Sequence, residues 1–213
     1  GTIKLWPKDG RGEPVVLTHG HKSVEVSLAV LSDGRLASGG DDGAIKLWPK
    51  DGREDPVILP RGSEGEKILS LAALSDGRLA STGSNGMIRL WPKDSPGEPV
   101  VLTQGRENEW VLCRAVLPDG RLACGSSDGT IQIWPKDGKG QPVFLPHGNS
   151  SVSAHAVLAD GRLASGGIDG IIKLWPKDGR GEPAVLTQGR EDEWVLCLAV
   201  LPDGRLASSS SDG

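Results

Sequence analysis

The sequence predicts an all-β protein, a five-bladed β-propeller of four-stranded antiparallel blades, and three observations predict it. A Trp-Pro-Lys-Asp tetrapeptide recurs at a nearly constant spacing through the 213 residues. Within each repeat, apolar residues alternate or run continuously, and Gly, Pro or Asp-Gly interrupts them too often for helices to form. Four short strands in each repeat of about 43 residues are typical of propeller blades.

The tetrapeptide defines the repeats. It begins at Trp6, Trp48, Trp91, Trp134 and Trp175. Cutting before the Gly that precedes each Ile-Lys-Leu-Trp type segment gives units 1–42, 43–85, 86–128, 129–169 and 170–212. The third and fifth units are identical at 34 of 43 aligned positions, which indicates recent amplification of one ancestral unit or deliberate engineering. Because no other segment separates the units, residues 1–213 are expected to form a single propeller domain.

The first unit shows how each repeat is divided into strands. The expected strands are Thr2–Trp6, Pro14–Leu17, Val24–Leu31 and Arg35–Ser38. Asp33-Gly34 is expected to form the hairpin turn between the last two, because Asp and Gly tolerate the positive φ of such turns. The third strand alternates small residues with Leu, so we expect it to be innermost. Cys113 and Cys197 lie in this strand and are interpreted as small packing residues rather than nucleophiles.

Composition and charge argue against several classes of function. The net charge of −4 gives no basic surface for nucleic acid or anionic lipid. No run of about 18 apolar residues predicts a membrane span, and no secretory leader is recognised. The three cysteines lack paired spacing, so we expect no disulfide framework and a cytoplasmic location. The histidines lack the spacing of a zinc site, and no cofactor or metal is expected.

One stretch carries a family resemblance. Residues 32–48 read Ser-Asp-Gly-Arg-Leu-Ala-Ser-Gly-Gly-Asp-Asp-Gly-Ala-Ile-Lys-Leu-Trp, and all five units repeat this pattern. It resembles the WD-repeat family. Two features depart from the family pattern: Pro replaces the Asp that usually follows Trp, and the Gly-His dipeptide survives only as Gly20-His21. The aligned positions elsewhere are Glu64, Glu107, Gly148 and Glu191.

The resemblance implies a structural hydrogen-bond chain of His, Ser or Thr, Asp and Trp in each blade. In the first unit His21, Ser38, Asp42 and Trp48 match all four positions. Elsewhere the aligned His is missing, and Asn85 and Cys124 replace the Asp and the Ser in one unit each. We therefore expect most blades to depend on packing more than on this chain, and we expect the protein not to be an enzyme.

The two ends of the chain are complementary. By the family pattern the chain starts with the third and fourth strands of a blade and ends with the first and second. Pairing of Thr2–Leu17 with Val195–Ser209 would complete the fifth blade, so we expect a closed monomer. The alternative is an open arc that assembles with another copy.

The segments before the third strands vary most and are expected to form one rim. Loop variation within a repeated unit permits specificity, and Trp and Arg are enriched where proteins bind one another. The candidate partner-binding residues are His19, His21, Arg61, Glu64, Arg106, Glu107, Trp110, Arg190, Glu191 and Trp194. Arg114 and His155 stand where other units have Leu, and we expect them to line the central channel.

These features favour a non-catalytic scaffold or sensor module that binds a protein partner on the variable rim. One alternative is a lectin-like propeller that binds carbohydrate or a small ligand, for which the similar segments Thr103–Trp110 and Thr187–Trp194 would supply two matched sites. Another is a recently amplified or engineered propeller with no selected partner.

Overall fold

The computed structural model describes most of the chain. The described residues are 2–17, 21, 26–93, 97–103, 109–187, 189 and 193–211, with the backbone alone described at 113 and 114. Within these ranges the regular elements are twenty β-strands, and all their pairings are antiparallel. The described part contains no helix that could cross a membrane. The chain is therefore all-β, as predicted.

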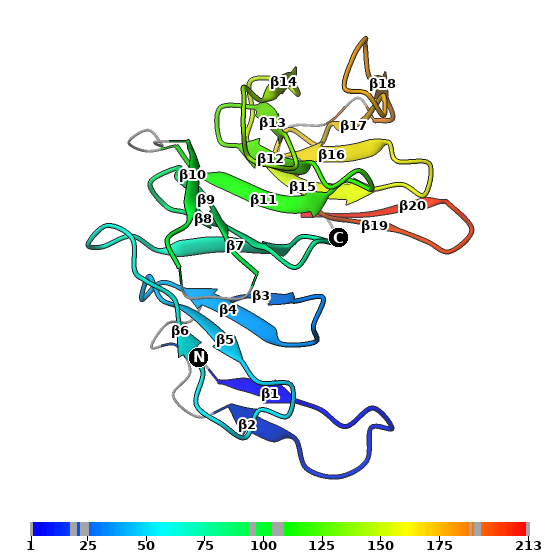
Figure 1. The fold of residues 1–213 in the computed structure, drawn as a ribbon. Helices are drawn as coiled ribbons and strands as arrows, with labels where there is room; N and C mark the ends of the chain where they lie inside the picture. The colour runs from blue at the N-terminus through cyan, green and yellow to red at the C-terminus, as the bar shows by residue number, and fades with distance from the viewer. Residues whose placement is uncertain are drawn as a thin grey trace. The chain divides into compact units, whose positions relative to one another are not determined.

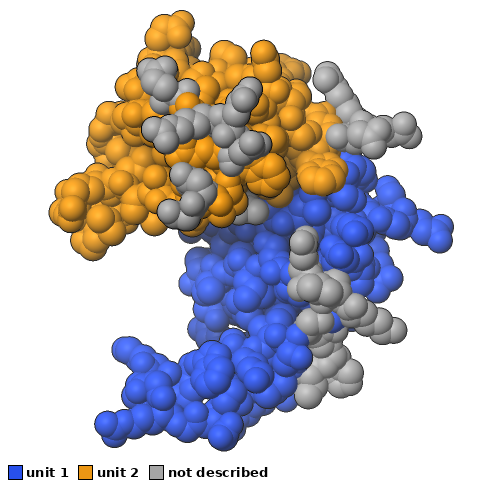
Figure 2. All heavy atoms as spheres, turned by 180° about the vertical axis from the view of Figure 1, so that it is seen from behind, with its two compact units in different colours: residues 1–108 blue, residues 109–213 orange. Residues whose placement is uncertain are grey.

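The chain forms two compact units, Gly1–Asn108 and Glu109–Gly213, which Figure 2 colours blue and orange. The boundary falls inside the third repeat of the sequence, at the end of the variable segment that precedes its third strand. That the five repeats form a single domain stays a prediction.

Unit 1 contains one two-stranded sheet and two complete blades (Figure 1). The two-stranded sheet consists of β1 (Ile3–Leu5) and β2 (Val15–Leu17). Blade 1 has the order β3 (Val26–Val30), β4 (Leu36–Gly40), β5 (Ile45–Trp48) and β6 (Val57–Ile58). Blade 2 has the order β7 (Ile68–Ala73), β8 (Leu79–Gly83), β9 (Ile88–Trp91) and β10 (Val100–Thr103).

Unit 2 contains two complete blades followed by a two-stranded sheet. Blade 3 has the order β11 (Val111–Val116), β12 (Leu122–Ser126), β13 (Thr130–Trp134) and β14 (Val143–Pro146). Blade 4 has the order β15 (Val152–Val157), β16 (Leu163–Gly167), β17 (Ile172–Trp175) and β18 (Ala184–Val185). The last sheet pairs β19 (Val195–Val200) with β20 (Leu206–Ser210).

The first sequence repeat has a strand within or overlapping each expected segment, with shorter or shifted bounds, and its hairpin turn is confirmed. Positions 24 and 25 of the expected third strand lie outside the described residues. The Gly34 amide donates to the Leu31 carbonyl at 2.8 Å, and Gly34 has a φ of 87°, which L-residues rarely adopt. Asp33 accepts from the Arg35 amide at 2.9 Å and from the Arg35 guanidinium at 2.7 Å. This local bonding explains why the Asp-Gly-Arg sequence forms a tight turn.

Neighbouring blades pack through apolar faces where glycine allows the sheets to approach. In unit 1, Ile68 and Leu71 of β7 join a core cluster with Ala37 of β4. In unit 2, a Cβ added at Gly166 of β16 would clash with the Val195 side chain of β19. These contacts bury the inner strand of one blade against the second strand of the blade before it.

Two sheets have only two strands each, β1–β2 in unit 1 and β19–β20 in unit 2, and the sequence predicts that together they form a fifth blade. Each half has the strands that the sequence assigned to it. Closure of the ring by pairing of the terminal strands stays a prediction.

The cysteines differ from the expectation. Cys197 is a free, exposed thiol. Cys124 is disulfide-bonded, so the expectation of a chain without disulfides is wrong at this position. The residue that faces Cys124 across the β11–β12 ladder is Cys113. Register in the folded sheet, which sequence spacing did not reveal, brings these two backbone positions together.

We predict that Gly166→Ala lowers the free energy of unfolding by about 1–3 kcal/mol, because the new methyl group overpacks the contact with Val195. Urea denaturation followed by circular dichroism measures this change. Ser209 is the matched control, since it has the equivalent position in the last repeat and already carries a Cβ. Ser209→Ala should change stability by less than about 0.5 kcal/mol, and equal effects of the two substitutions would contradict the packing argument.

Candidate functional site

Four residues immediately before inner strands occupy equivalent positions, and we call them the rim positions. They are Lys67, Trp110, Ser151 and Trp194. The carbonyl of each accepts a hydrogen bond from the backbone amide of a residue 17 positions later, with lengths of 2.9 to 3.0 Å. The end of each variable segment is thereby tied to the turn that follows the second strand of its own repeat.

Trp110 and Trp194 are held by a second bond as well. The Trp110 amide donates to Ser127 Oγ at 3.1 Å, and the Trp194 amide donates to Ser211 Oγ at 2.9 Å. The Trp110 residue is nevertheless 63% exposed and Trp194 is 50% exposed. A fixed backbone that presents a large exposed aromatic side chain loses little conformational entropy on binding.

The other predicted rim residues have mixed outcomes. Arg61 and Glu64 are exposed. Those outside the described residues are His19, Arg106, Glu107, Arg190 and Glu191. His21 is 3% exposed and bonded within blade 1, so its surroundings give it a structural role and leave little of it for a partner.

Blade 1 contains the complete hydrogen-bond chain that the sequence predicted. Trp48 Nε1 donates to Ser38 Oγ at 2.8 Å, and Ser38 Oγ lies 2.8 Å from His21 Nε2. His21 Nδ1 lies 2.7 Å from Asp42 Oδ1. With a proton on Nδ1, His21 donates to the carboxylate and accepts from the Ser38 hydroxyl, so each polar atom along the chain has a partner of the right kind.

The charge state of Asp42 agrees with this arrangement. Burial acts to raise the pKa of Asp42, but hydrogen bonds from His21 and from the Ala44 amide outweigh it, so that the pKa lies below its ordinary value of 3.8. Asp42 is therefore an ionised acceptor near neutral pH.

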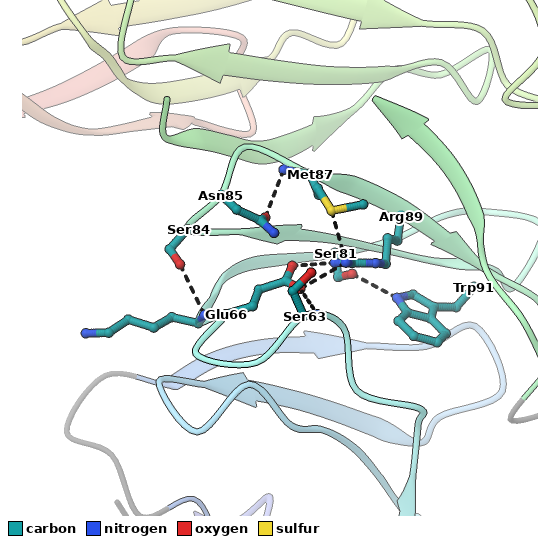
Figure 3. Close-up of polar contacts among 9 residues, drawn as sticks. Ser63, Glu66, Ser81, Ser84, Asn85, Met87, Arg89 and Trp91 are labelled. Carbon is teal, nitrogen blue, oxygen red and sulfur yellow. Dashed lines mark hydrogen bonds and ion pairs between the residues drawn. The ribbon is translucent and has the colours of Figure 1, made fainter. Parts of the chain in front are cut away.

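Blade 2 uses a buried ion pair in place of His and Asp (Figure 3). Glu66 and Arg89 are each 6% exposed and bond bidentately, with Arg89 Nη2 donating to Glu66 Oε2 at 2.9 Å. Glu66 Oε2 also accepts from the Ser63 amide at 3.0 Å, and Trp91 Nε1 donates to Ser81 Oγ at 2.8 Å. The alignment had placed Glu64 here, whereas the buried carboxylate is Glu66.

In blade 3 the buried tryptophan has a different hydrogen-bond acceptor. Cys124 replaces the Ser, and Trp134 Nε1 instead donates to Gln132 Oε1 at 3.1 Å. Ser126 Oγ donates to Glu109 Oε1 at 3.0 Å. Glu66 and Glu109 each directly precede a rim position, a shared location that could have identified both from the sequence.

The expectation that only the first repeat has a histidine in this hydrogen-bond network is wrong, because blade 4 also has one. His147 is fully buried, its Nδ1 lies 2.8 Å from Ser165 Oγ, and Trp175 Nε1 donates to the same oxygen at 2.7 Å. His147 Nε2 is 3.9 Å from Asp169 Oδ1, beyond hydrogen-bond distance. The alignment had placed Gly148 here, one residue away, because the order in this repeat is His-Gly.

Burial lowers the pKa of His147 below its ordinary value of 6.5, although the negative charge of Asp169 acts in the opposite direction. His147 is therefore neutral at physiological pH.

The two predicted channel residues are only partly described. His155 is 8% exposed, and its ring lies so close to Gly125 of blade 3 that a Cβ there would be 2.5 Å from His155 Cε1. The side chain of Arg114 lies outside the described residues. A role for either residue in a central channel stays a prediction. Among the described residues no cluster of three or more His, Cys, Asp or Glu side chains could hold a metal ion.

Comparisons with known proteins agree with this geometry. A family model described as "WD domain, G-beta repeat" matches residues 12–49, 56–92, 97–135, 140–176 and 183–213. A comparison with curated proteins found no match. Among solved structures, the computationally designed Ika8 protein is 27% identical with a TM-score of 0.75. The match covers 100% of this chain and 63% of that chain, so this chain spans less than two thirds of the designed protein.

We predict that Glu66→Met lowers the free energy of unfolding by about 3–5 kcal/mol, because it leaves the buried Arg89 charge without its partner. The double variant Glu66→Met/Arg89→Met should regain most of that stability, since it removes both charges. Guanidinium denaturation of the single and double variants measures the difference. A double variant as unstable as the single one would contradict this account of the pair.

We also predict that stability falls as the pH decreases from about 7 to 5. Below pH 6.5 the unfolded chain protonates His147, whereas the folded chain with its lowered pKa does not, so the proton favours the unfolded state. One such group changes the free energy of unfolding by at most about 1.4 kcal/mol per pH unit. Urea midpoints measured across this range should vary less with pH in His147→Gln, and an unchanged slope would contradict the assignment.

Proposed function

Because the chain belongs to the WD-repeat family, we propose that it is a non-catalytic scaffold or sensor module that binds a protein partner on the rim. WD repeats generally mediate protein interactions and are typically non-catalytic. The residues that we assign to partner contact are Trp110 and Trp194 of unit 2. Partner contact by Arg61 and Glu64 of unit 1, which are exposed, stays a separate prediction.

The observation that carries the proposal is the contrast between fixed backbone and exposed side chain at the two rim tryptophans. The indole rings that end the third strands of the complete blades are 1 to 6% exposed, whereas Trp110 and Trp194 are at least half exposed. Covering such rings removes apolar surface from water, and each can supply a substantial share of binding energy. Exposed charged groups would act mainly on association rate and specificity.

Carbohydrate or small-ligand binding is the second candidate. Trp110 and Trp194 have equivalent positions, the same backbone clamp and nearly the same preceding sequence, which is the duplication that a lectin-like protein would use for avidity. Ser151 and Lys67 at the other rim positions break the repetition. The repetition of the site is therefore incomplete, which favours a protein partner over a ligand that needs an identical sugar pocket in every repeat.

The proposed location is the cytoplasm. A disulfide at Cys124 would be transient there, because cytosolic thiols are kept reduced.

We predict that the double variant Trp110→Ala/Trp194→Ala captures its protein partner from lysate at least about tenfold less than the unchanged protein, because a hot-spot aromatic contributes about 2 kcal/mol or more. Quantitative mass spectrometry of the captured proteins measures this loss. Phe144→Ala is the matched control, since Phe144 is 60% exposed in unit 2 but lies on β14.

Equal loss in the Phe144 control would show nonspecific adhesion and contradict the rim assignment. If no protein is captured specifically, a glycan array tests the second candidate, for which binding should depend on both tryptophans.

A further inference from the structure

The turn after β8 in blade 2 contains an asparagine that is followed by glycine. Of the three asparagines in the chain, Asn85 is the one that Gly follows. In the other four repeats the equivalent position, at 42, 128, 169 and 212, is Asp. An Asn-Gly sequence is chemically reactive, because glycine has no side chain to hinder attack of its backbone nitrogen on the side-chain carbonyl carbon of the asparagine. This turn is therefore a candidate site of chemical modification.

The reaction replaces the side-chain amide by a carboxyl group. The Gly86 nitrogen forms a bond to Cγ of Asn85, the bond from Cγ to Nδ2 breaks, and Nδ2 takes the Gly86 proton and leaves as ammonia. One water molecule then opens the cyclic imide and returns a proton to the Gly86 nitrogen. Breaking the new bond gives aspartate. Breaking the original peptide bond gives isoaspartate, in which the main chain runs through Cγ.

Two hydrogen bonds of the turn act on this reaction in opposite directions (Figure 3). The Met87 amide donates to Asn85 Oδ1 at 3.1 Å, so it polarises the carbonyl group that is attacked and can stabilise the negative charge that develops on this oxygen. The Gly86 amide donates to the Gly83 carbonyl at 3.0 Å, so this bond must open before the nitrogen can react. The reaction therefore requires the opening of one turn, and it should be slower than in a free peptide of the same sequence.

The backbone of the turn accommodates aspartate as well as asparagine. In blades 1, 3 and 4 the carboxylates of Asp42, Asp128 and Asp169 accept from the amide two residues later at 2.9 to 3.2 Å, as Asn85 does. The glycine that follows each of these aspartates has a φ of 69 to 84°, and Gly86 has a φ of 72°. Isoaspartate instead adds one main-chain atom, which the closed turn does not accommodate.

Blade 2 differs from the other blades in the charge that lies beside this turn. Glu66 is buried and bonds bidentately to Arg89. Glu66 and Asn85 approach the same backbone atom, since a Cβ added at Gly83 would clash with Glu66 and lie 2.6 Å from Asn85 Oδ1. A neutral amide at position 85 is compatible with the buried carboxylate. A carboxylate there would place two negative charges beside one guanidinium group.

We propose that Asn85 is a site of spontaneous deamidation and that the carboxylate formed there weakens blade 2 by repelling Glu66. The encoded amide keeps the turn bonded without adding charge beside the ion pair, and its hydrolysis converts a stable blade into a weaker one as the protein ages. The groups involved all belong to unit 1. Because the rim tryptophans take no part, failure of this proposal is distinguishable from failure of the proposed partner binding.

Incubation of the purified protein at mildly alkaline pH, followed by peptide mass spectrometry, tests the reaction. Asn149 is the matched control, because it is exposed and is followed by Ser. Asn85 should gain the mass of deamidation several times faster than Asn149. Enzymatic methylation with S-adenosylmethionine, which labels isoaspartyl carboxyl groups, should mark the same peptide. A rate at Asn85 no greater than at Asn149 would overturn the assignment of the site.

Urea denaturation of Asn85→Asp tests the consequence. This variant should have an unfolding equilibrium constant at least about threefold larger than that of the unchanged protein, as is usual for coupling between neighbouring groups. In a Glu66→Gln background the same substitution should cause no loss, since the carboxylate that it repels is gone. Equal losses in the two backgrounds, or no loss in the unchanged background, would overturn the proposed repulsion.

Chains modified during the incubation give the same test without any substitution. Ion-exchange chromatography separates them from unmodified chains, because each deamidation adds one negative charge. Chains modified at position 85 should unfold at a lower urea concentration than unmodified chains from the same sample, and equal midpoints would contradict the proposal even if Glu66→Gln does not fold.

Discussion

The buried indole at the end of each third strand is the interaction on which the complete blades depend. A tryptophan supplies more apolar area than any other side chain in these repeats, but its ring nitrogen carries a proton that must be given an acceptor. A buried N–H without one would cost about 1–3 kcal/mol. In each complete blade an oxygen on the second or third strand accepts this proton at 2.7 to 3.1 Å. Apolar burial and hydrogen bonding are thus satisfied at the same point.

The support for that acceptor differs from blade to blade although the repeats are closely similar. Blade 1 uses neutral and ionic hydrogen bonds through His21, and blade 4 places His147 on the serine with its carboxylate farther away. Blade 2 instead buries the Glu66–Arg89 pair. The requirement is for a filled volume and a satisfied polar group, which several side-chain combinations meet. Variation at these positions is therefore compatible with one backbone fold.

Exposed tryptophan has two different origins in this protein. Trp6 belongs to the strand-end class that is buried in every complete blade, but it follows β1, which pairs with β2 alone in a two-stranded sheet. Trp110 and Trp194 directly precede β11 and β19, and the backbone amide and carbonyl of each are hydrogen-bonded, so the side chains are exposed although the backbone is held. The first kind reflects the pairing of one strand, and the second kind is the observation on which the proposed partner binding rests.

The sequence by itself determined the all-β class, the repeat length, the four strands per repeat and the Asp-Gly turns, because these follow from local periodicity and backbone conformational preference. The resemblance to the WD-repeat family also predicted the hydrogen-bond chain of His21, Ser38, Asp42 and Trp48, because these residues match the four family positions. Only the tertiary structure showed that Glu66 forms an ion pair with Arg89 and that His147 lies within hydrogen-bond distance of Ser165. The buried residue lies one or two positions from the aligned residue in these repeats. Because the loops differ in length, sequence alignment alone does not show which of the neighbouring side chains is buried. Burial on a neighbouring sheet depends in the same way on contacts between segments far apart in the chain, which no local pattern records.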